Sequence, residues 1–298
     1  MDAKQKKRIG CGALVLLFLI GLTLMLVFLY FRSSGQQTSL SAFQEKALVV
    51  VRIENAIFNS EKAVKQLDAC RKDDGVKAVV LRIDSPGGGV AACQEIYEAV
   101  KRLRESGRKV VASFGSVAAS GGYYIACAAD SIVSNPGSVT GSIGVIFEFP
   151  YLEELMKKVG VELEVVKSGS YKDAGGFHRK MSLEERRVFQ SLIDDTWSQF
   201  MEVVSEGRHL SSDSVRKLAD GRIYTGRQAK NAGLVDVMGT FEDAKILAGK
   251  MAGLPEDTAP FEFKAPGSML RFLMGDVEER LQQKMGSFSP GLAYLFKG

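Results

Sequence analysis

The stretch "FGSVAASGGYYIACAAD" runs from Phe114 to Asp130 and surrounds one serine with small residues. It places Ser120 after two alanines and before two glycines, and an apolar run, "RKVVASF" at 108–114, leads into it. Small residues on both sides of one hydroxyl allow a tight turn and the close approach of another chain segment. The pattern therefore predicts a nucleophilic serine on the turn between a strand and a helix, and such a serine needs a general base.

Strand-like apolar runs alternate with helical patterns on the N-terminal side of this turn. Strands are predicted for "ALVVVRI" (47–53) and "VKAVVLRID" (76–84), and helices for "EKAVKQLDACRKD" (61–73) and "AACQEIYEAVKRLRESG" (91–107). Strands that are separated by helices favour an α/β domain with largely parallel pairing.

Helical patterns dominate the sequence beyond Val145. A helix is predicted over 151–160, then a strand over 161–169, and then a long helix that begins after Ser182. Ser182 and Glu185 in "SLEE" form the pattern of a capping box. Apolar residues recur at helical spacing along this helix, which predicts a packing surface. They are Phe189, Leu192, Ile193, Trp197, Phe200 and Val204.

A second glycine-rich turn, "RIDSPGGGV" at Arg82–Val90, lies between a predicted strand and a predicted helix. Glycines leave backbone N–H groups uncovered, and such donors suit an oxyanion hole. They would also suit a phosphate group, although the sequence has neither of the common nucleotide-binding glycine patterns here. By itself such a stretch is more often a simple turn than a binding site.

Three residues are candidates for the base. His209 in "SEGRHLSSD" follows the long helix, where a solvated or capping role is expected, and His178 in "GGFHRKM" has no aspartate marked as a partner. A Ser-His-Asp triad is therefore poorly supported. Lys172 in "KSGSYKDAGG" follows an apolar run and lies between small residues. A buried lysine loses its proton more readily and can then act as a base.

The N-terminus reads as a membrane anchor. Ile9–Phe31 carries no charge and is long enough to cross a hydrocarbon core of about 30 Å as a helix. Four basic residues precede it in "MDAKQKKR", which predicts an N-terminus on the cytoplasmic side. A cleaved signal peptide is the alternative, but the run ends "FLYFRSSG", without a small-residue cleavage site.

The remaining boundaries follow from composition. Residues 1–32 form a basic stub and the anchor, 33–46 a polar linker, 47–257 the catalytic domain and 258–298 a C-terminal tail. The net charge of +4 comes from the N-terminal segment, because residues 33–298 hold equal numbers of basic and acidic side chains. No basic stripe indicates nucleic-acid binding.

The cysteines predict neither a metal site nor a disulfide framework. Cys11 lies in the apolar N-terminal run, and Cys70, Cys93 and Cys127 follow without any CxxC pattern or Cys/His cluster. Buried, free thiols are expected rather than a disulfide. No metal and no other cofactor is expected.

The sequence contains five motifs, in this order: "DSPGG" at 84–88, "AASGGYYIA" at 118–126, "SVTGSIGV" at 138–145, "KSGSYKDAG" at 167–175 and "GRIYTGRQAKNAGLVDVMG" at 221–239. Together they resemble the signal peptide peptidase A (SppA) family of serine proteases. The resemblance implies that Ser120 is the nucleophile, Lys172 the general base and Ser142 a residue that supports the lysine by a hydrogen bond. The backbone N–H groups of Gly88 and Gly121 would form the oxyanion hole.

The resemblance also implies a fold and a function. The fold would be an α/β, ClpP/crotonase-type superhelix of repeated β-β-α units, preceded by one transmembrane helix. The protein would be a Ser-Lys dyad endopeptidase that degrades cleaved signal peptides and other short hydrophobic peptides. It would lie in the bacterial inner (cytoplasmic) membrane as a single-pass protein with its catalytic domain outside the cytoplasm. The short, single-domain form implies a cyclic homo-oligomer.

Two alternatives stay open at the level of sequence. One is a related membrane protease with a dedicated membrane-protein substrate, and the other is an inactive scaffold on the same fold. Acyl-CoA enzymes of the crotonase type share only the fold, and an exported site makes a CoA substrate a poor match.

Overall fold

The computed structural model describes residues 21–22, 25, 47–263 and 293–295 of the chain. The predicted linker at 33–46 lies outside these residues, as does the predicted anchor Ile9–Phe31 apart from Gly21, Leu22 and Met25. Among the residues described, no helix combines the length and the apolar character needed to span a bilayer. The chain divides into two units, Met1–Glu45 and Lys46–Gly298, and the second unit holds the fold described below.

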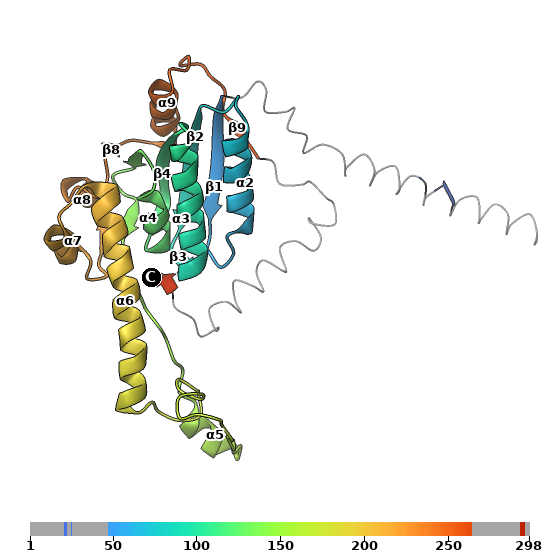
Figure 1. The fold of residues 1–298 in the computed structure, drawn as a ribbon, viewed down its shortest axis with the longest axis vertical. Helices are drawn as coiled ribbons and strands as arrows, with labels where there is room; N and C mark the ends of the chain where they lie inside the picture. Colours follow the sequence, from blue (N-terminus) through green and yellow to red (C-terminus); the bar gives the residue numbers. More distant parts are fainter. Residues whose placement is uncertain (1–20, 23–24, 26–46, 264–292, 296–298) are drawn as a thin grey trace, which may run out of the picture. The chain divides into compact units, whose positions relative to one another are not determined.

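The second unit is built on a mixed sheet of eight strands (Figure 1). The sheet runs in the order β7–β6–β4–β2–β1–β9, and β5 and β8 extend it beside β4. The β6–β7 pair is antiparallel, whereas the other described pairs of this sheet are parallel. The strands are β1 Leu48–Glu54, β2 Ala78–Ser85, β4 Lys109–Ala119, β5 Ser131–Ser134, β6 Val139–Gly141, β7 Ile223–Thr225, β8 Val237–Met238 and β9 Phe261–Glu262.

The central strands are apolar on both faces because helices cover both faces. Helices α2 (Glu61–Lys72) and α3 (Val90–Glu105) lie side by side on one face, and α9 (Phe241–Met251) packs against β1, β2 and β4 (Figure 1). Leu48, Val50 and Val80 form a buried cluster with Ala244 and Ala248 of α9. The strands and helices predicted for residues 47–107 are therefore confirmed, with small shifts at their ends.

Strand β4 extends five residues further than the sequence indicates. Its first part pairs with β5 through residues 111–113, and its last part pairs with β6 through residues 117–119. Pairing with β2 continues past a register irregularity between Ile83 and Ser85. Strand β4 thus crosses from one neighbour to another and ends at Ala119, directly before Ser120.

A separate two-stranded ladder joins parts of the chain that are far apart in sequence. Strand β3 (Gly87–Gly89) pairs antiparallel with β10 (Ala293–Leu295). In this register Tyr294 lies opposite Gly88 and Leu295 lies opposite Gly87. A short segment of the predicted C-terminal tail therefore lies on the glycine-rich turn as an extended strand.

The long helix α6 (Leu183–Arg208) begins with the predicted capping box. The Ser182 hydroxyl accepts a hydrogen bond from the Glu185 N–H at 3.1 Å, and the Glu185 carboxylate accepts one from the Ser182 N–H at 2.8 Å. The C-terminal part of α6 buries Phe200 and Val204 against the body of the domain. Three shorter helices of the domain are α4 (Gly121–Ala126), α7 (Ser212–Leu218) and α8 (Gly226–Asn231).

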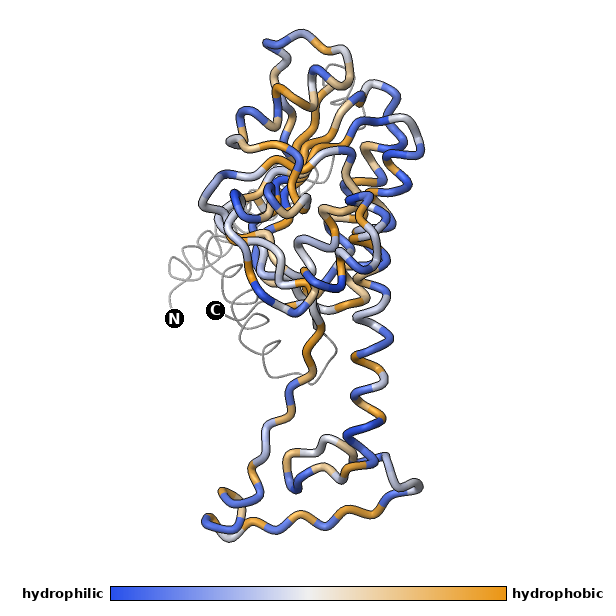
Figure 2. Tube along the Cα trace, turned by 90° about the vertical axis from the view of Figure 1, so that its left-hand side faces the viewer, coloured by the Kyte–Doolittle hydropathy of each residue, from blue (hydrophilic) through white to orange (hydrophobic). Residues whose placement is uncertain are grey.

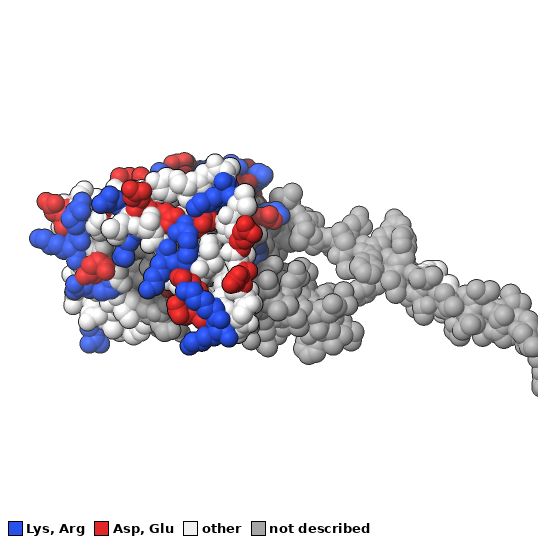
Figure 3. Space-filling model, turned by 90° about the horizontal axis from the view of Figure 1, so that it is seen from below, with Lys and Arg blue, Asp and Glu red and all other residues white. Residues whose placement is uncertain are grey.

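Residues 146–181, here called the arm, project from the domain beside the N-terminal part of α6 (Figure 2). The arm contains α5 (Glu153–Val159). It contacts α6 through stacked rings of Phe147 and Phe149, both of which lie against Phe189. Seen from the end of the arm, basic and acidic side chains are interspersed with uncharged surface (Figure 3).

The strand predicted at 161–169 is wrong, because this part of the arm pairs with no other strand in the described chain. Its alternating sequence is nevertheless apolar and solvent-facing, and Val166 is 94% exposed. Other exposed apolar side chains of the arm and the adjoining turn of α6 are Tyr151, Leu152, Leu155, Val159, Val161, Leu163, Val165, Tyr171, Phe177 and Leu183. An exposed apolar surface of this extent is typical of an interface.

Candidate active site

Ser120 occupies the turn between β4 and α4, as the sequence predicts. Its N–H donates to the Gly141 carbonyl at 2.8 Å, and its own carbonyl accepts from the Tyr124 N–H at 2.8 Å. These bonds hold the residue at φ 51° and ψ −115°, a backbone conformation that residues other than glycine rarely adopt. The hydroxyl is buried and has no hydrogen-bond partner within the described chain. The backbone of Ser120 is therefore held in place, but no base contacts its hydroxyl within the described chain.

Two glycines bring the turn of β3 against Ser120. A side chain on Gly121 would place its Cβ 2.5 Å from the Cys93 Sγ and 3.2 Å from the Gly88 nitrogen. Gly87 has φ 100°, and a Cβ there would lie 2.6 Å from the Gly121 nitrogen. The backbone amides of Gly88 and Gly121 thus lie side by side next to the serine. That arrangement suits the stabilisation of an oxyanion.

The strand β10 pairs with one edge of β3, the edge that faces Ser120. A Cβ on Gly87 would lie 2.0 Å from the carbonyl oxygen of Tyr294 and 2.6 Å from the Gly121 nitrogen, so this carbonyl lies against the glycine-rich turn near the Gly121 amide. On the opposite edge of β3, the Ile57 carbonyl accepts from the Gly89 N–H at 2.9 Å. The edge that faces Ser120 therefore accepts an extended peptide in antiparallel orientation, and in this structure the chain's own segment fills it.

The side chain of Tyr294 fills an aromatic pocket. It is fully buried and stacks on Tyr124 with a centroid distance of 5.0 Å, and its ring lies 4.7 Å from that of Phe200. Its hydroxyl donates to the Thr196 carbonyl at 3.2 Å. Burial raises the pKa of the Tyr294 hydroxyl well above its usual value. The edge of β3 and the aromatic pocket beside it form a groove. This groove accepts a peptide backbone along β3 and one large side chain between α4 and α6.

Ser142 lies near the same groove but has no described bond to Ser120 or Lys172. It follows β6, has φ 50°, and its N–H donates to the Arg222 carbonyl at 2.8 Å. It lines a pocket of about 560 Å³ together with Gly144, Trp197 and Leu295. Its position is compatible with a role beside an incoming base.

Lys172 lies in the arm and is exposed. The arm contacts α6 around Glu185, whereas α4, which follows Ser120, contacts α6 through Phe200. Fifteen residues of helix separate these two contacts, which corresponds to about 22 Å along the axis. The fold therefore brings Ser120, Gly88 and Gly121 together within the chain, but it places Lys172 elsewhere.

Neither histidine lies at the serine. His209 is the C-cap of α6 in the left-handed conformation, which confirms the capping role expected for it. His178 does have an aspartate neighbour, contrary to the expectation from sequence, because its Nε2 lies 3.5 Å from an oxygen of Asp173. Both residues of that pair belong to the arm, so they do not reach Ser120 in this chain.

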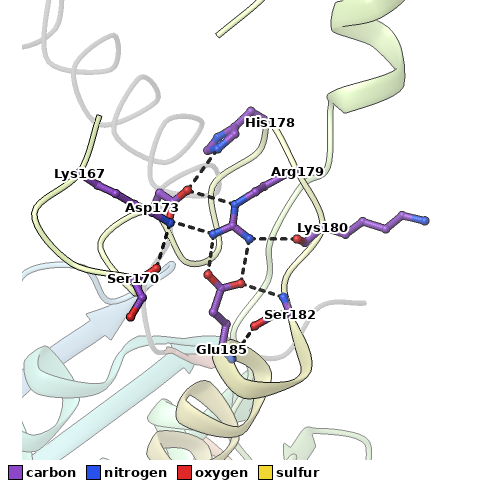
Figure 4. A network of polar contacts seen from close by, with 8 residues as sticks. All are labelled: Lys167, Ser170, Asp173, His178, Arg179, Lys180, Ser182 and Glu185. Atoms are coloured by element: carbon purple, nitrogen blue, oxygen red, sulfur yellow. Dashed lines mark hydrogen bonds and ion pairs between the residues drawn. The ribbon is translucent and has the colours of Figure 1, made fainter. Parts of the chain in front are cut away.

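Reasoning from the sequence missed an ionic cluster in the arm, which includes Asp173, the residue after Lys172 (Figure 4). Asp173 accepts hydrogen bonds from Lys167 and Arg179, and Arg179 also binds Glu185 at the start of α6. The density of charges in "KDAGGFHRKMSLEE" was the available signal. The three cysteines, in contrast, are buried and free as expected, and burial raises the pKa of each thiol to about 12.

The backbone of Ser120 supports a prediction about stability. Ser120→Gly and Ser120→Ala both remove the hydroxyl, but only glycine adopts φ 51° without a steric penalty. We expect the glycine variant to have the higher free energy of unfolding, by about 1 kcal/mol, as measured by urea denaturation. Equal stability, or a more stable alanine variant, would show that this turn stores no strain.

Two protein-family profiles match parts of this chain. Residues 102–254 match the profile of Peptidase family S49, and residues 32–136 match that of Clp protease. The second match confirms the coarser part of the predicted fold, an α/β fold of the ClpP type with a mixed sheet. The repeated β-β-α superhelix stays a prediction.

Several relatives are similar over most of the chain. A protein named as a protease in Synechocystis is 44% identical over 77% of this chain and 83% of its own length. One named as a protease in Methanocaldococcus jannaschii is 37% identical over 77% of each chain. A protein named as signal peptide peptidase SppA in Enterococcus faecium is 38% identical over 63% of this chain and 54% of its own. Among solved structures, a ClpP1 variant from Listeria monocytogenes aligns at 18% identity with a TM-score of 0.47, covering 69% of this chain and 98% of its own.

Proposed function

The chain belongs to peptidase family S49 and is a serine protease, and from this premise we propose that it is a membrane-anchored endopeptidase for short hydrophobic peptides. The substrates would include signal peptides after their release from exported proteins. Ser120 would attack the scissile carbonyl, and Lys172 would take the proton of its hydroxyl. The amides of Gly88 and Gly121 would stabilise the oxyanion, and Ser142 would orient the lysine.

The observation that carries this proposal is the strand β10. It lies antiparallel on Gly87–Gly89, with a carbonyl beside the amides next to Ser120 and an aromatic side chain in the pocket lined by Tyr124 and Phe200. Recognition by strand addition binds any extended peptide through its backbone, while pockets select the side chains. A folded protein cannot present such a strand, so unstructured peptides are the substrates that fit.

We propose further that the active site is completed by a second copy of this chain. Three observations support this: the unpartnered Ser120 hydroxyl, the exposed position of Lys172, and the apolar surface of the arm. A ring of identical contacts would bring the arm of one copy to the serine of the next, because head-to-tail contacts close into rings when the rotation allows it.

We propose that residues 9–31 anchor this assembly in the bacterial cytoplasmic membrane, with the catalytic domain outside the cytoplasm. The uncharged run and the basic residues before it support this orientation. In protease-protection experiments, the catalytic domain would then be digested in spheroplasts and protected in inverted vesicles. The opposite pattern would overturn the proposed orientation.

A peptide digest tests the proposed activity. The purified protein is incubated with a library of unstructured peptides and with folded globular proteins, and the products are read by mass spectrometry. We expect cuts within apolar peptides and none in folded proteins, and the Ser120→Ala protein should give no cuts. Cutting of native proteins, or equal cutting by the variant, would contradict the proposal.

The strand β10 leads to a prediction about the C-terminal residues. A chain that lacks residues 292–298 should hydrolyse a short peptide with kcat/KM raised by about tenfold, because an internal competitor for the groove is removed. Removal of residues 296–298 alone is the matched control, because it keeps β10 and the Tyr294 ring. If both truncations behave like the full chain, β10 does not compete with substrate.

A further inference from the structure

The register of β10 on β3 fixes which side chain of a bound peptide accompanies the carbonyl beside the catalytic turn. We propose that the protease cuts after tyrosine, because the pocket between α4 and α6 receives the side chain of the residue immediately before the scissile bond. Tyr124 and Phe200 are the residues that make this pocket selective for an aromatic ring. The inference rests on the proposed function, in which Ser120 attacks a peptide that binds along β3, and it names the residue at which the chain is cut.

One residue of β10 supplies both the carbonyl near the proposed oxyanion donors and the side chain in the pocket. The carbonyl oxygen of Tyr294 and the nitrogen of Gly121 both lie within 2.6 Å of one point, the position that a Cβ on Gly87 would take. Tyr294 also pairs with Gly88, the residue of the other proposed donor. Its ring is fully buried. A substrate that binds in this register therefore presents to Ser120 the carbonyl of the same residue whose side chain fills the pocket.

The next residue of β10 enters a different part of the site. Leu295 lines the second pocket, together with Ser142 and Trp197. A substrate in the same register would place the residue after the cut there. Ser120 Oγ would bond to the tyrosyl carbonyl carbon, and the peptide C–N bond would break as the leaving amine takes the proton held by Lys172. Water would then hydrolyse the ester and release a peptide that ends in tyrosine.

Two rings form the walls of the aromatic pocket and hold the Tyr294 ring between them. Tyr124 stacks on that ring at a centroid distance of 5.0 Å and an interplanar angle of 22°, and Phe200 meets it at 4.7 Å and 54°. The two walls also contact each other edge to face at 5.1 Å. Aromatic pairs of this geometry are more favourable than their buried area alone accounts for. An aliphatic side chain in the pocket would lose this contribution.

The pocket is fixed relative to the nucleophile and has a polar group at its far end. The Tyr124 N–H donates to the Ser120 carbonyl at 2.8 Å, which attaches one wall directly to the catalytic turn. The Tyr294 hydroxyl donates to the Thr196 carbonyl at 3.2 Å, a bond that a phenylalanine could not make. Burial raises the pKa of Tyr124 to about 12, and such a poorly solvated pocket excludes a charged side chain.

A tyrosine scan tests the inference on the full chain. One tyrosine is moved a single position at a time through an otherwise aliphatic, unstructured peptide, and the products are identified by mass spectrometry. The cut should follow the tyrosine, which should be the last residue of each N-terminal product. Replacement of this tyrosine by phenylalanine should lower kcat/KM by about fivefold, and replacement by leucine by about fiftyfold. A cut that stays in place, or that leaves the tyrosine elsewhere in the product, would overturn the inference.

A pair of variants tests the pocket itself. Phe200→Leu should lower the ratio of kcat/KM for the tyrosine peptide to that for the leucine peptide by about tenfold. Phe114→Leu is the matched control, because it makes the same change at a fully buried ring that contacts Tyr123, and it should leave this ratio unchanged. An unchanged ratio in folded Phe200→Leu protein would overturn the pocket assignment, and the tyrosine scan decides if this variant does not fold. Failure of the proposed function looks different, because the wild type would then cut no peptide or Ser120→Ala would cut equally well.

Discussion

Ser120→Ala is expected to lower kcat for an apolar peptide by about a million-fold, because a serine protease without its nucleophile retains only the background from binding and the oxyanion donors. Lys172→Ala should lower kcat by about a hundredfold to ten-thousandfold, which is the usual contribution of a general base. Both variants should keep the wild-type far-UV circular dichroism. Ser120 already lies among small residues, and the Lys172 side chain is exposed in the isolated chain.

A matched variant controls for the loss of a positive charge from the arm. Lys158→Ala removes another lysine from the arm, in the last turn of α5, and should leave kcat unchanged. Should Lys172→Ala retain more than a few per cent of the activity, the Ser-Lys dyad is the wrong assignment. His178 would then be the next residue to replace, because it is the imidazole that lies against a carboxylate.

Mixing the two inactive proteins should restore activity. The Ser120→Ala and Lys172→Ala chains are dissociated in denaturant, combined in equal amounts and reassembled. If each site takes its serine from one copy and its lysine from the next, about a quarter of the sites in a random ring are complete. Hydrolysis of the apolar peptide should then rise from background to roughly that fraction of the rate of wild-type protein treated in the same way.

The control for mixing is a chain that carries both substitutions. Combined with Lys172→Ala it can form no complete site, so this mixture must stay inactive. If the Ser120→Ala and Lys172→Ala mixture also stays inactive while wild-type protein recovers, the dyad lies within one chain. The arm would then have to reach the serine of its own chain by a large movement along α6.

The sequence predicts the local features of this fold well and the long-range ones poorly. The runs that became β1, β2, α2 and α3 have the periodicity of their structures, and the capping box of Ser182 and Glu185 depends on residues three positions apart. The C-terminal end of strand β4 could not be predicted from local sequence, because its last residues pair with β6, which lies further along the chain. The alternating apolar residues of the arm predict a strand, but this pattern does not require pairing with another strand. It indicates only a segment with apolar side chains that can be buried against some other surface.

The candidate site divides in the same way. Ser120 and the glycine-rich turn at Gly87–Gly89 can be predicted from the residues, because glycine and small residues mark the places where backbones must approach each other. The choice of Gly88 and Gly121 as the two oxyanion donors comes from the family resemblance. Lys172 could be selected by its motif, but no local pattern says that it lies on an arm away from the serine. The position of Tyr294 was also beyond prediction, because an aromatic side chain near a chain end has no periodicity to place it. The ionic cluster of Asp173, Arg179 and Glu185 depends on a turn that propensity does not specify.

The placement of Lys172 on an arm also shapes how mutant alleles would behave together. If every chain lends its serine to one site and its lysine to another, an allele that loses one of these residues disables one site for each mutant chain. An allele that loses both disables two. In a cell that makes equal amounts of normal and double-mutant chains, only about a quarter of the sites would stay intact, against about half with a single mutant. The double-mutant allele would therefore be the more strongly dominant of the two, although each defective protein is equally inactive by itself.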